Sequence, residues 1–175
     1  DGRILYQQAL IHQEQNSNAQ KKQQETLDDI KKLLQSQKSQ KLSYTDIIKI
    51  FNTLSNVIHK GYFSTAEALI PIIETQIDDR DRFYCTSLRI LLKGYTGTHH
   101  EVDDLCIQFS RENPSQETVE IIVKFLLQMD IKSAIVVLKP IIAAPLSALI
   151  NGYISDNPQD EIASIVKDGG NIKDE

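Results

Sequence analysis

Residues 43–73, SYTDIIKIFNTLSNVIHKGYFSTAEALIPII, decide the fold class of this chain. In the first half of the stretch, apolar residues recur three or four positions apart, at Ile47, Ile50, Phe51, Leu54 and Ile58. After Gly61 the same spacing returns, at Ala66, Leu69, Ile70 and Ile73. Such spacing places apolar side chains on one face of an α-helix, whereas a half-buried strand would need strict alternation. The stretch therefore predicts two amphipathic helices joined by a short turn.

The helical spacing continues through most of the remaining sequence. It recurs at Val102, Leu105, Cys106 and Phe109, and again at Ala134, Ile135, Leu138 and Ile142. Residues 118–129 are apolar on most faces of a helix, which predicts that this segment is buried or meets a partner. Strict alternation is absent, so the sequence predicts an all-α fold without a sheet.

Helix-start signals repeat at a fixed distance along the chain. Ser64-x-x-Glu67 and Thr98-x-x-Glu101 have the pattern of capping boxes and lie 34 residues apart. Further N-cap candidates share the 34-residue spacing, namely Thr45, Asp79, Asn113 and Ser147, and Asn157 precedes a proline in the same way as Asn113. The spacing predicts a repeated pair of helices.

This period resembles the tetratricopeptide repeat, a helix–turn–helix unit of about 34 residues. Ala66 and Ala134 match the small residue of that family's second helix, whereas His100 at the same phase does not. The small residue of the first helix is replaced by larger ones, Leu54, Leu88 and Ile122. The resemblance implies an α-solenoid of three to four units over residues 44–167. Another array of helix pairs, or a bundle without repeats, stays open.

The first 43 residues differ in composition from the rest of the chain. They are rich in Gln and carry seven Lys or Arg against five Asp or Glu, whereas the remaining residues carry 12 against 19. Apolar residues are nearly missing between Gln13 and Thr26. After this stretch, Leu27, Ile30, Leu33 and Leu34 have the spacing of one face of a helix. Residues 1–43 are therefore predicted to form a helical, partly flexible arm, and residues 168–175 a disordered tail.

Composition and motifs exclude several classes of function. The net charge of -5 argues against a generic nucleic-acid binder, and no apolar run approaches the length of a membrane helix. No nucleophile motif and no Gly-rich phosphate loop is present, so we expect neither an enzyme nor a cofactor. The two cysteines, Cys85 and Cys106, are expected to be reduced and buried. Together these features predict an intracellular protein, in the cytoplasm or the nucleus, that does not insert into membranes.

One cluster has metal-ligand spacing. His99 with Asp103 and His100 with Asp104 are pairs four residues apart, a spacing that can chelate zinc on a helix face. Because these residues fall in the first turns of a capped helix, where acidic side chains favour the helix dipole, we expect a solvated helix start and no metal site.

The resemblance to tetratricopeptide repeats also implies a groove lined by the first helix of each pair. Those helices carry basic and amide side chains at helical spacing: Lys49, Asn52 and Asn56; Arg82, Arg89 and Lys93; Lys124 and Gln128. Such side chains bind carboxylates and peptide backbone, so we expect capture of a peptide or helix of another protein. The sequence thus predicts a non-catalytic scaffold or an adaptor subunit of a larger complex.

Three other interpretations stay open. Each polar stripe is also what a solvated helix face would show. The Lys- and Gln-rich arm would suit a nucleic-acid-associated assembly or processing factor. Residues 118–129 and the N-terminal helices would suit a self-associating structural subunit.

Overall fold

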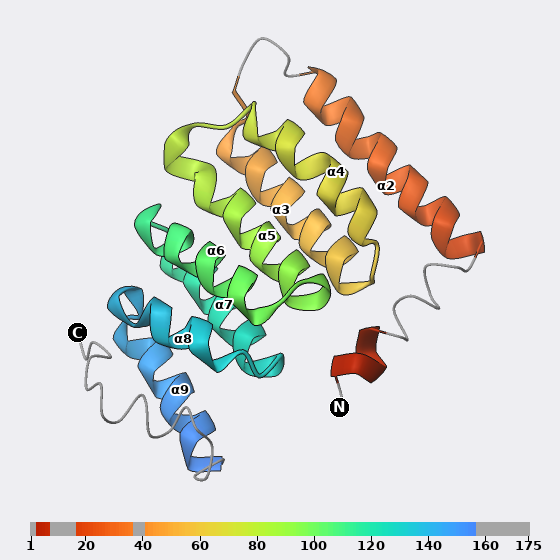
Figure 1. The fold of residues 1–175 in the computed structure, drawn as a ribbon. Helices are drawn as coiled ribbons and strands as arrows, with labels where there is room; N and C mark the ends of the chain where they lie inside the picture. Colours follow the sequence, from red (N-terminus) through yellow and green to blue (C-terminus); the bar gives the residue numbers. More distant parts are fainter. Residues whose placement is uncertain (1–2, 8–16, 37–40, 157–175) are drawn as a thin grey trace. The chain divides into compact units, whose positions relative to one another are not determined.

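The computed structural model describes residues 3–7, 17–36 and 41–156, and in these ranges it contains helices and turns but no strand (Figure 1). The predicted all-α class is confirmed. A helical turn over residues 3–7 comes first. It is followed by α2 (Ser17–Ser36), α3 (Tyr44–His59), α4 (Phe63–Glu74), the 3-10 turn η1 (Asp79–Asp81), α5 (Arg82–Thr96), α6 (His99–Arg111), α7 (Gln116–Gln128), α8 (Lys132–Leu138), the 3-10 turn η2 (Lys139–Ile141) and α9 (Ala144–Asp156). The predicted tail over residues 168–175 and the predicted cap at Asn157 lie outside the described residues.

The chain divides into two compact units, Asp1–Gly97 and Thr98–Glu175. In the first unit, α4 packs against α3 and α5, and α3 also contacts α5. The stripe predicted for α3 is buried, together with one further residue, Val57. The stripe predicted for α4 is buried too, and Ala66 is fully inaccessible to solvent. The 3.6-residue period therefore identified the core face of both helices.

The helix predicted within the arm is α2, which lies beside α3 and α4 (Figure 1). Of the four residues in the predicted pattern, Ile30 and Leu34 are buried, and Leu27 and Leu33 are half-buried. The helix begins at Ser17, so it takes in most of the Gln-rich stretch that precedes these residues. Residues 8–16 of the predicted arm lie outside the described part of the chain.

In the second unit, α8 packs against both α6 and α7. Three residues of the predicted α6 stripe are buried, namely Val102, Cys106 and Phe109. The apolar stripe predicted at Ala134, Ile135, Leu138 and Ile142 is also buried, and its first three residues lie in α8. Most apolar residues of α7 are buried as expected, but Ile121 is 39% exposed.

The predicted helix starts are correct to within a few residues, but several predicted caps are wrong. Thr98 forms the capping box with Glu101 as predicted. Ser64 is wrong as a cap, because α4 begins one residue earlier and its N-cap, Tyr62, has no side-chain cap bond. For α3, Ser43 rather than Thr45 accepts from the Asp46 amide, at 3.2 Å.

The other predicted caps also lie beside the true helix starts. Asn113 has a positive φ of 56°, and the cap of α7 is Ser115, which accepts from the Thr118 amide. Asp79 starts the 3-10 turn η1 instead of α5. Ser147 lies inside α9, where its hydroxyl donates to the Ala143 carbonyl. The predicted starts thus lie within a few residues of the observed ones, whereas the capping residue depends on local backbone conformation.

Candidate protein-interaction site

The exposed face of α3 carries the first predicted stripe. Lys49, Asn52 and Asn56 all lie on this face because the opposite face of α3 is buried in the core. Among the described residues, none of these three side chains takes part in a hydrogen bond or an ion pair. One ammonium and two amides are therefore available to a binding partner. We call Lys49, Asn52 and Asn56 the α3 stripe.

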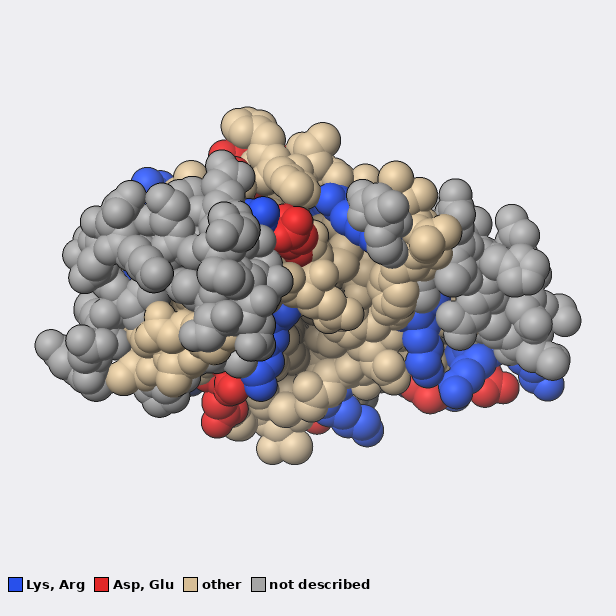
Figure 2. All heavy atoms as spheres, turned by 90° about the horizontal axis from the view of Figure 1, so that it is seen from below, with Lys and Arg blue, Asp and Glu red and all other residues tan. Residues whose placement is uncertain are grey.

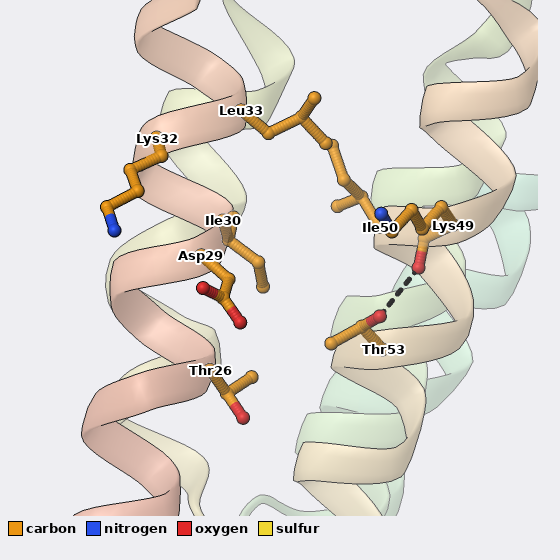
Figure 3. A pocket seen from close by; sticks show the side chains of 8 residues that line it. All are labelled: Thr26, Asp29, Ile30, Lys32, Leu33, Lys49, Ile50 and Thr53. Carbon is orange, nitrogen blue, oxygen red and sulfur yellow. Dashed lines mark hydrogen bonds between the residues drawn. The ribbon is translucent and has the colours of Figure 1, made fainter.

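A cavity of about 470 Å³ lies between α2 and α3 and borders the α3 stripe. Figure 3 shows Lys49 reaching from α3 toward the side of α2, and Asp29 projecting from α2 into the gap. The Lys32 side chain lies on the far side of α2 in that view. The apolar part of the wall comes from Ile30, Leu33 and Ile50, and two hydroxyl residues, Thr26 and Thr53, complete the lining.

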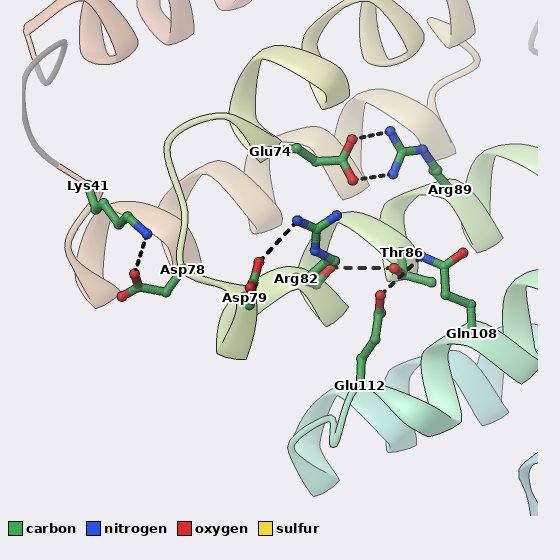
Figure 4. A network of polar contacts seen from close by, with 9 residues as sticks. All are labelled: Lys41, Glu74, Asp78, Asp79, Arg82, Thr86, Arg89, Gln108 and Glu112. Carbon is green, nitrogen blue, oxygen red and sulfur yellow. Dashed lines mark hydrogen bonds and ion pairs between the residues drawn. The ribbon is translucent and has the colours of Figure 1, made fainter.

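In the second predicted stripe, on α5, the two arginines pair with acidic side chains of this protein (Figure 4). Arg89 forms a bidentate ion pair with Glu74 of α4, with N–O distances of 2.6 and 2.5 Å. Arg82 lies 3.1 Å from Asp79. Lys93 is half-buried and takes part in a further interaction. The structure therefore separates the α5 residues, which have internal partners, from the unengaged α3 stripe.

The Arg89–Glu74 pair is electrostatically favourable. The hydrogen bond from Arg89 lowers the pKa of Glu74 below its ordinary value of 4.5, although partial burial of the carboxylate acts in the opposite direction. Bidentate arginine–carboxylate pairs are shorter and stronger than neutral hydrogen bonds. Arg89 thereby fastens α5 to α4, a role that its place in a polar stripe did not reveal.

The third predicted stripe lies on α7, in the second unit. Lys124 is exposed and lies 3.0 Å from Glu120, one helical turn earlier. Gln128 is the last residue of the helix and is exposed. A solvent-exposed pair of this kind contributes little to stability, so Lys124 can exchange Glu120 for another carboxylate at small cost.

An aromatic cluster that the sequence did not point to attaches the helical turn over residues 3–7 to the first unit. The Tyr6 hydroxyl donates to the His59 carbonyl at 3.0 Å, and the Tyr6 and Tyr95 rings lie 5.5 Å apart. The Tyr95 hydroxyl lies 2.6 Å from His59 Nδ1, and the Phe63 ring stacks on Tyr95. Burial lowers the pKa of His59 and is the largest of the causes that raise the pKa of Tyr95. Tyr6 stands in a short apolar patch before the Gln-rich stretch, and its place in the sequence did not indicate which helix it contacts.

The residues with metal-ligand spacing have other neighbours. His100 Nε2 lies 3.5 Å from Asp104, and Asp103 accepts a 2.7 Å hydrogen bond from Ser133 of α8. In the described part of the chain, no three His, Cys, Asp or Glu side chains gather as metal ligands would. Cys85 and Cys106 form no disulfide in the described structure, and both are buried, as predicted. Burial, with a smaller contribution from Asp103, raises the pKa of Cys106 to about 12, so its thiol stays protonated at neutral pH.

Charged side chains of both signs are mixed on the surface. On the face seen in Figure 2, described Lys and Arg side chains lie next to Asp and Glu. On α2, three exposed acids, Glu25, Asp28 and Asp29, lie between two pairs of exposed lysines, Lys21 with Lys22 and Lys31 with Lys32. Lys41, just before α3, pairs with Asp78 at 2.6 Å. This mixture differs from the single-signed basic face typical of nucleic-acid binding.

The described helices include none that is both long enough and apolar enough to cross a membrane. Comparison with protein-family models, curated proteins and solved structures gave no match.

Proposed function

We propose that this chain is a non-catalytic protein-interaction module, a scaffold or an adaptor subunit of a larger complex, which captures a peptide or helix of another protein. The observation that carries the proposal is the α3 stripe, whose ammonium and two amides are exposed and have no internal partner among the described residues. Unengaged polar groups at one-turn spacing can bind a segment that runs along the helix. No cofactor enters this mechanism.

The arrangement we propose is a tetratricopeptide-like α-solenoid over residues 44–167. The order of the helices supports it, since helices begin at Tyr44, Arg82 and Gln116, and the intervening helices begin at Phe63, His99 and Lys132. These starts recur at close to the 34-residue period of that family. In such an array the first helix of each pair faces the partner, which is the position that α3 would have.

Each group of the α3 stripe has a distinct role in the proposed capture. Lys49 attracts a carboxylate of the partner, and the Asn52 and Asn56 amides bind its backbone, because an amide both donates and accepts. Lys124 and Gln128 on α7 would offer the same chemistry in the second unit. Arg82 and Arg89 are less suited to contact a partner directly, since Asp79 and Glu74 already engage them.

An affinity capture with charge-reversed variants tests the proposal. Full-length chain is used as bait, and the recovered proteins are quantified by mass spectrometry. Lys49→Glu is expected to lower recovery of the specific partner at least about tenfold, because it replaces an attraction with a repulsion. Lys22→Glu on α2 is the matched control and should leave recovery unchanged. If Lys22→Glu lowers recovery of the partner and Lys49→Glu does not, the arm is the binding surface and the proposal is refuted.

A further inference from the structure

The helix α2 is attached to the rest of the first unit by a small set of apolar contacts. Among the α2 side chains whose burial the structure describes, Ile30 and Leu34 are buried, and Leu27 and Leu33 are half-buried. Between Ser17 and Glu25 the sequence offers no apolar residue except Ala19. The second half of the helix therefore supplies its apolar attachment to α3 and α4.

Polar contacts add little to this attachment. The described side-chain hydrogen bonds of α2, from Gln24 to Asp28 and from Thr26 to the Lys22 carbonyl, stay within the helix. Asp29 on α2 and Lys49 on α3 face the same cavity, yet they form no ion pair with each other or with other described residues (Figure 3). Removing α2 would thus break no described side-chain ion pair or hydrogen bond to the body.

The interface between α2 and α3 is also incompletely filled. Protein interiors are packed like organic crystals, with few voids larger than a water molecule. The cavity of about 470 Å³ between the two helices is partly open to solvent, so α2 and α3 are not close-packed along the stretch that borders it. By contrast, α3 buries five side chains that do not line this cavity: Ile47, Phe51, Leu54, Val57 and Ile58. A helix that is attached by few apolar side chains, beside a partly open cavity, is a candidate for reversible release.

We propose that the surface of α3 and α4 beneath α2 is an exchangeable helix seat, and that it accepts the α2 helix of a second copy of this chain. The structure itself shows that α2 fits the seat, so an identical helix from another copy finds the same apolar surface. The repeat of Leu27, Ile30 and Leu34 at helical spacing provides the apolar face that any occupant requires. Exchange of an identical element is a low-cost route to association. Lys49 lines the cavity beneath α2 and also belongs to the α3 stripe, whereas Asn52 and Asn56 belong to the stripe alone, and the apolar attachment of α2 does not depend on a partner captured there.

A synthetic, fluorescein-labelled peptide of residues 17–36 serves as the probe for a second copy's α2. Fluorescence anisotropy is measured while full-length chain is added. Saturable binding is expected, and Ile30→Asp in the chain should tighten it by about tenfold or more, because the competing internal α2 is released. The same substitution in the peptide should abolish binding, whereas Lys31→Ala in the peptide, on its exposed face, should leave binding unchanged.

A substitution in the seat provides the complementary measurement. Thr53 lines the cavity and is only half-buried, so Thr53→Arg can obstruct the seat with less risk to folding than a change at Ile50. It should abolish peptide binding, with the fold verified by circular dichroism. The proposal is overturned if the Ile30→Asp chain fails to bind the peptide, or if it binds no more tightly than the unaltered chain. Peptide binding that persists in Thr53→Arg would equally refute the seat.

Discussion

Arg89 of α5 and Glu74 of α4 form a bidentate ion pair, with N–O distances of 2.6 and 2.5 Å. Both side chains are largely shielded from solvent, with relative exposures of 30% and 20%. A sequence stripe that looked like a binding surface therefore contains a residue that joins two helices. The finding changes which variants can test binding, because Arg89→Glu would place two carboxylates together and perturb the fold itself.

The first prediction concerns the energy of this pair. Arg89→Ala is expected to lower the free energy of unfolding by about 1–3 kcal/mol, since it leaves a partly buried carboxylate without its partner. Urea unfolding of the two single variants, Arg89→Ala and Glu74→Ala, and of the double variant measures their coupling. A coupling of about 1 kcal/mol or more is expected. Strict additivity of the two single effects would show that the pair does not stabilise the protein.

The second prediction is the pH dependence of the same contact. Arg89 lowers the pKa of Glu74 in the folded state. The ion pair therefore contributes its full stabilisation at pH values above 4.5, the ordinary pKa of the carboxyl group, and this stabilisation is lost as the pH falls through the folded-state pKa. Glu74→Gln removes the titrating group. Urea unfolding at several pH values should show a stability difference between the two proteins that is constant near neutral pH and shrinks in acid. A difference that grows in acid would contradict the assigned direction.

Helix capping gives a third prediction with a control of its own. Thr98→Ala should destabilise the protein by about 1 kcal/mol, because it removes the capping box of α6. Ser64→Ala should stay within about 0.5 kcal/mol of the unaltered protein, since Ser64 is exposed inside the first turn of α4 and caps nothing. Thermal unfolding of both variants measures the two effects. Equal losses would mean that Ser64 does cap α4 in solution.

The fourth prediction concerns His59, which burial keeps neutral in the folded state. Since its folded pKa lies below the ordinary value of 6.5, stability should decline as pH falls below 6.5 and level off below the folded-state pKa. His59→Asn keeps a hydrogen-bond acceptor near the Tyr95 hydroxyl and removes the titration, so the decline should flatten. His100→Asn, at an exposed position, is the control, and this variant should show the same decline of stability with falling pH as the unaltered protein. An NMR titration midpoint for His59 above 6.5 would refute the assignment.

The parts of the fold that sequence predicted are those set by periodic burial. Ile47, Ile50 and Leu54 recur at helical spacing because one face of α3 must enter the core, and such a pattern can be recognised in the sequence alone. Caps were less predictable, as Ser43 and Thr45 are both good cap residues and only the backbone conformation selects Ser43. The turn at Gly61, with a φ of 93°, was signalled by its glycine, whereas Asn113 reached a positive φ without one.

The candidate site was predictable only as a set of polar residues. Exposure of Lys49, Asn52 and Asn56 follows from the helical period, and the structure agrees with it. Spacing along one helix does not reveal what an adjacent helix supplies, so the partner of Arg89 on α4 was invisible in the sequence. The cavity bordered by α2 and α3 could not be predicted for the same reason, because two different helices line it. The contacts of Tyr6 with His59 and Tyr95 were equally unpredictable, since they connect segments that are far apart in the sequence.

Site-specific photo-crosslinking tests the central claim, capture of a partner along α3, most directly. A photoreactive benzoylphenylalanine is placed at Asn56 of the α3 stripe and, in a matched variant, at Glu67, which is exposed on α4. The proposed function predicts one discrete cross-linked partner from Asn56, absent from Glu67, whose yield falls at least about tenfold when Lys49→Glu is added. Equal cross-linking from Glu67, or a yield from Asn56 that is indifferent to Lys49→Glu, would contradict it.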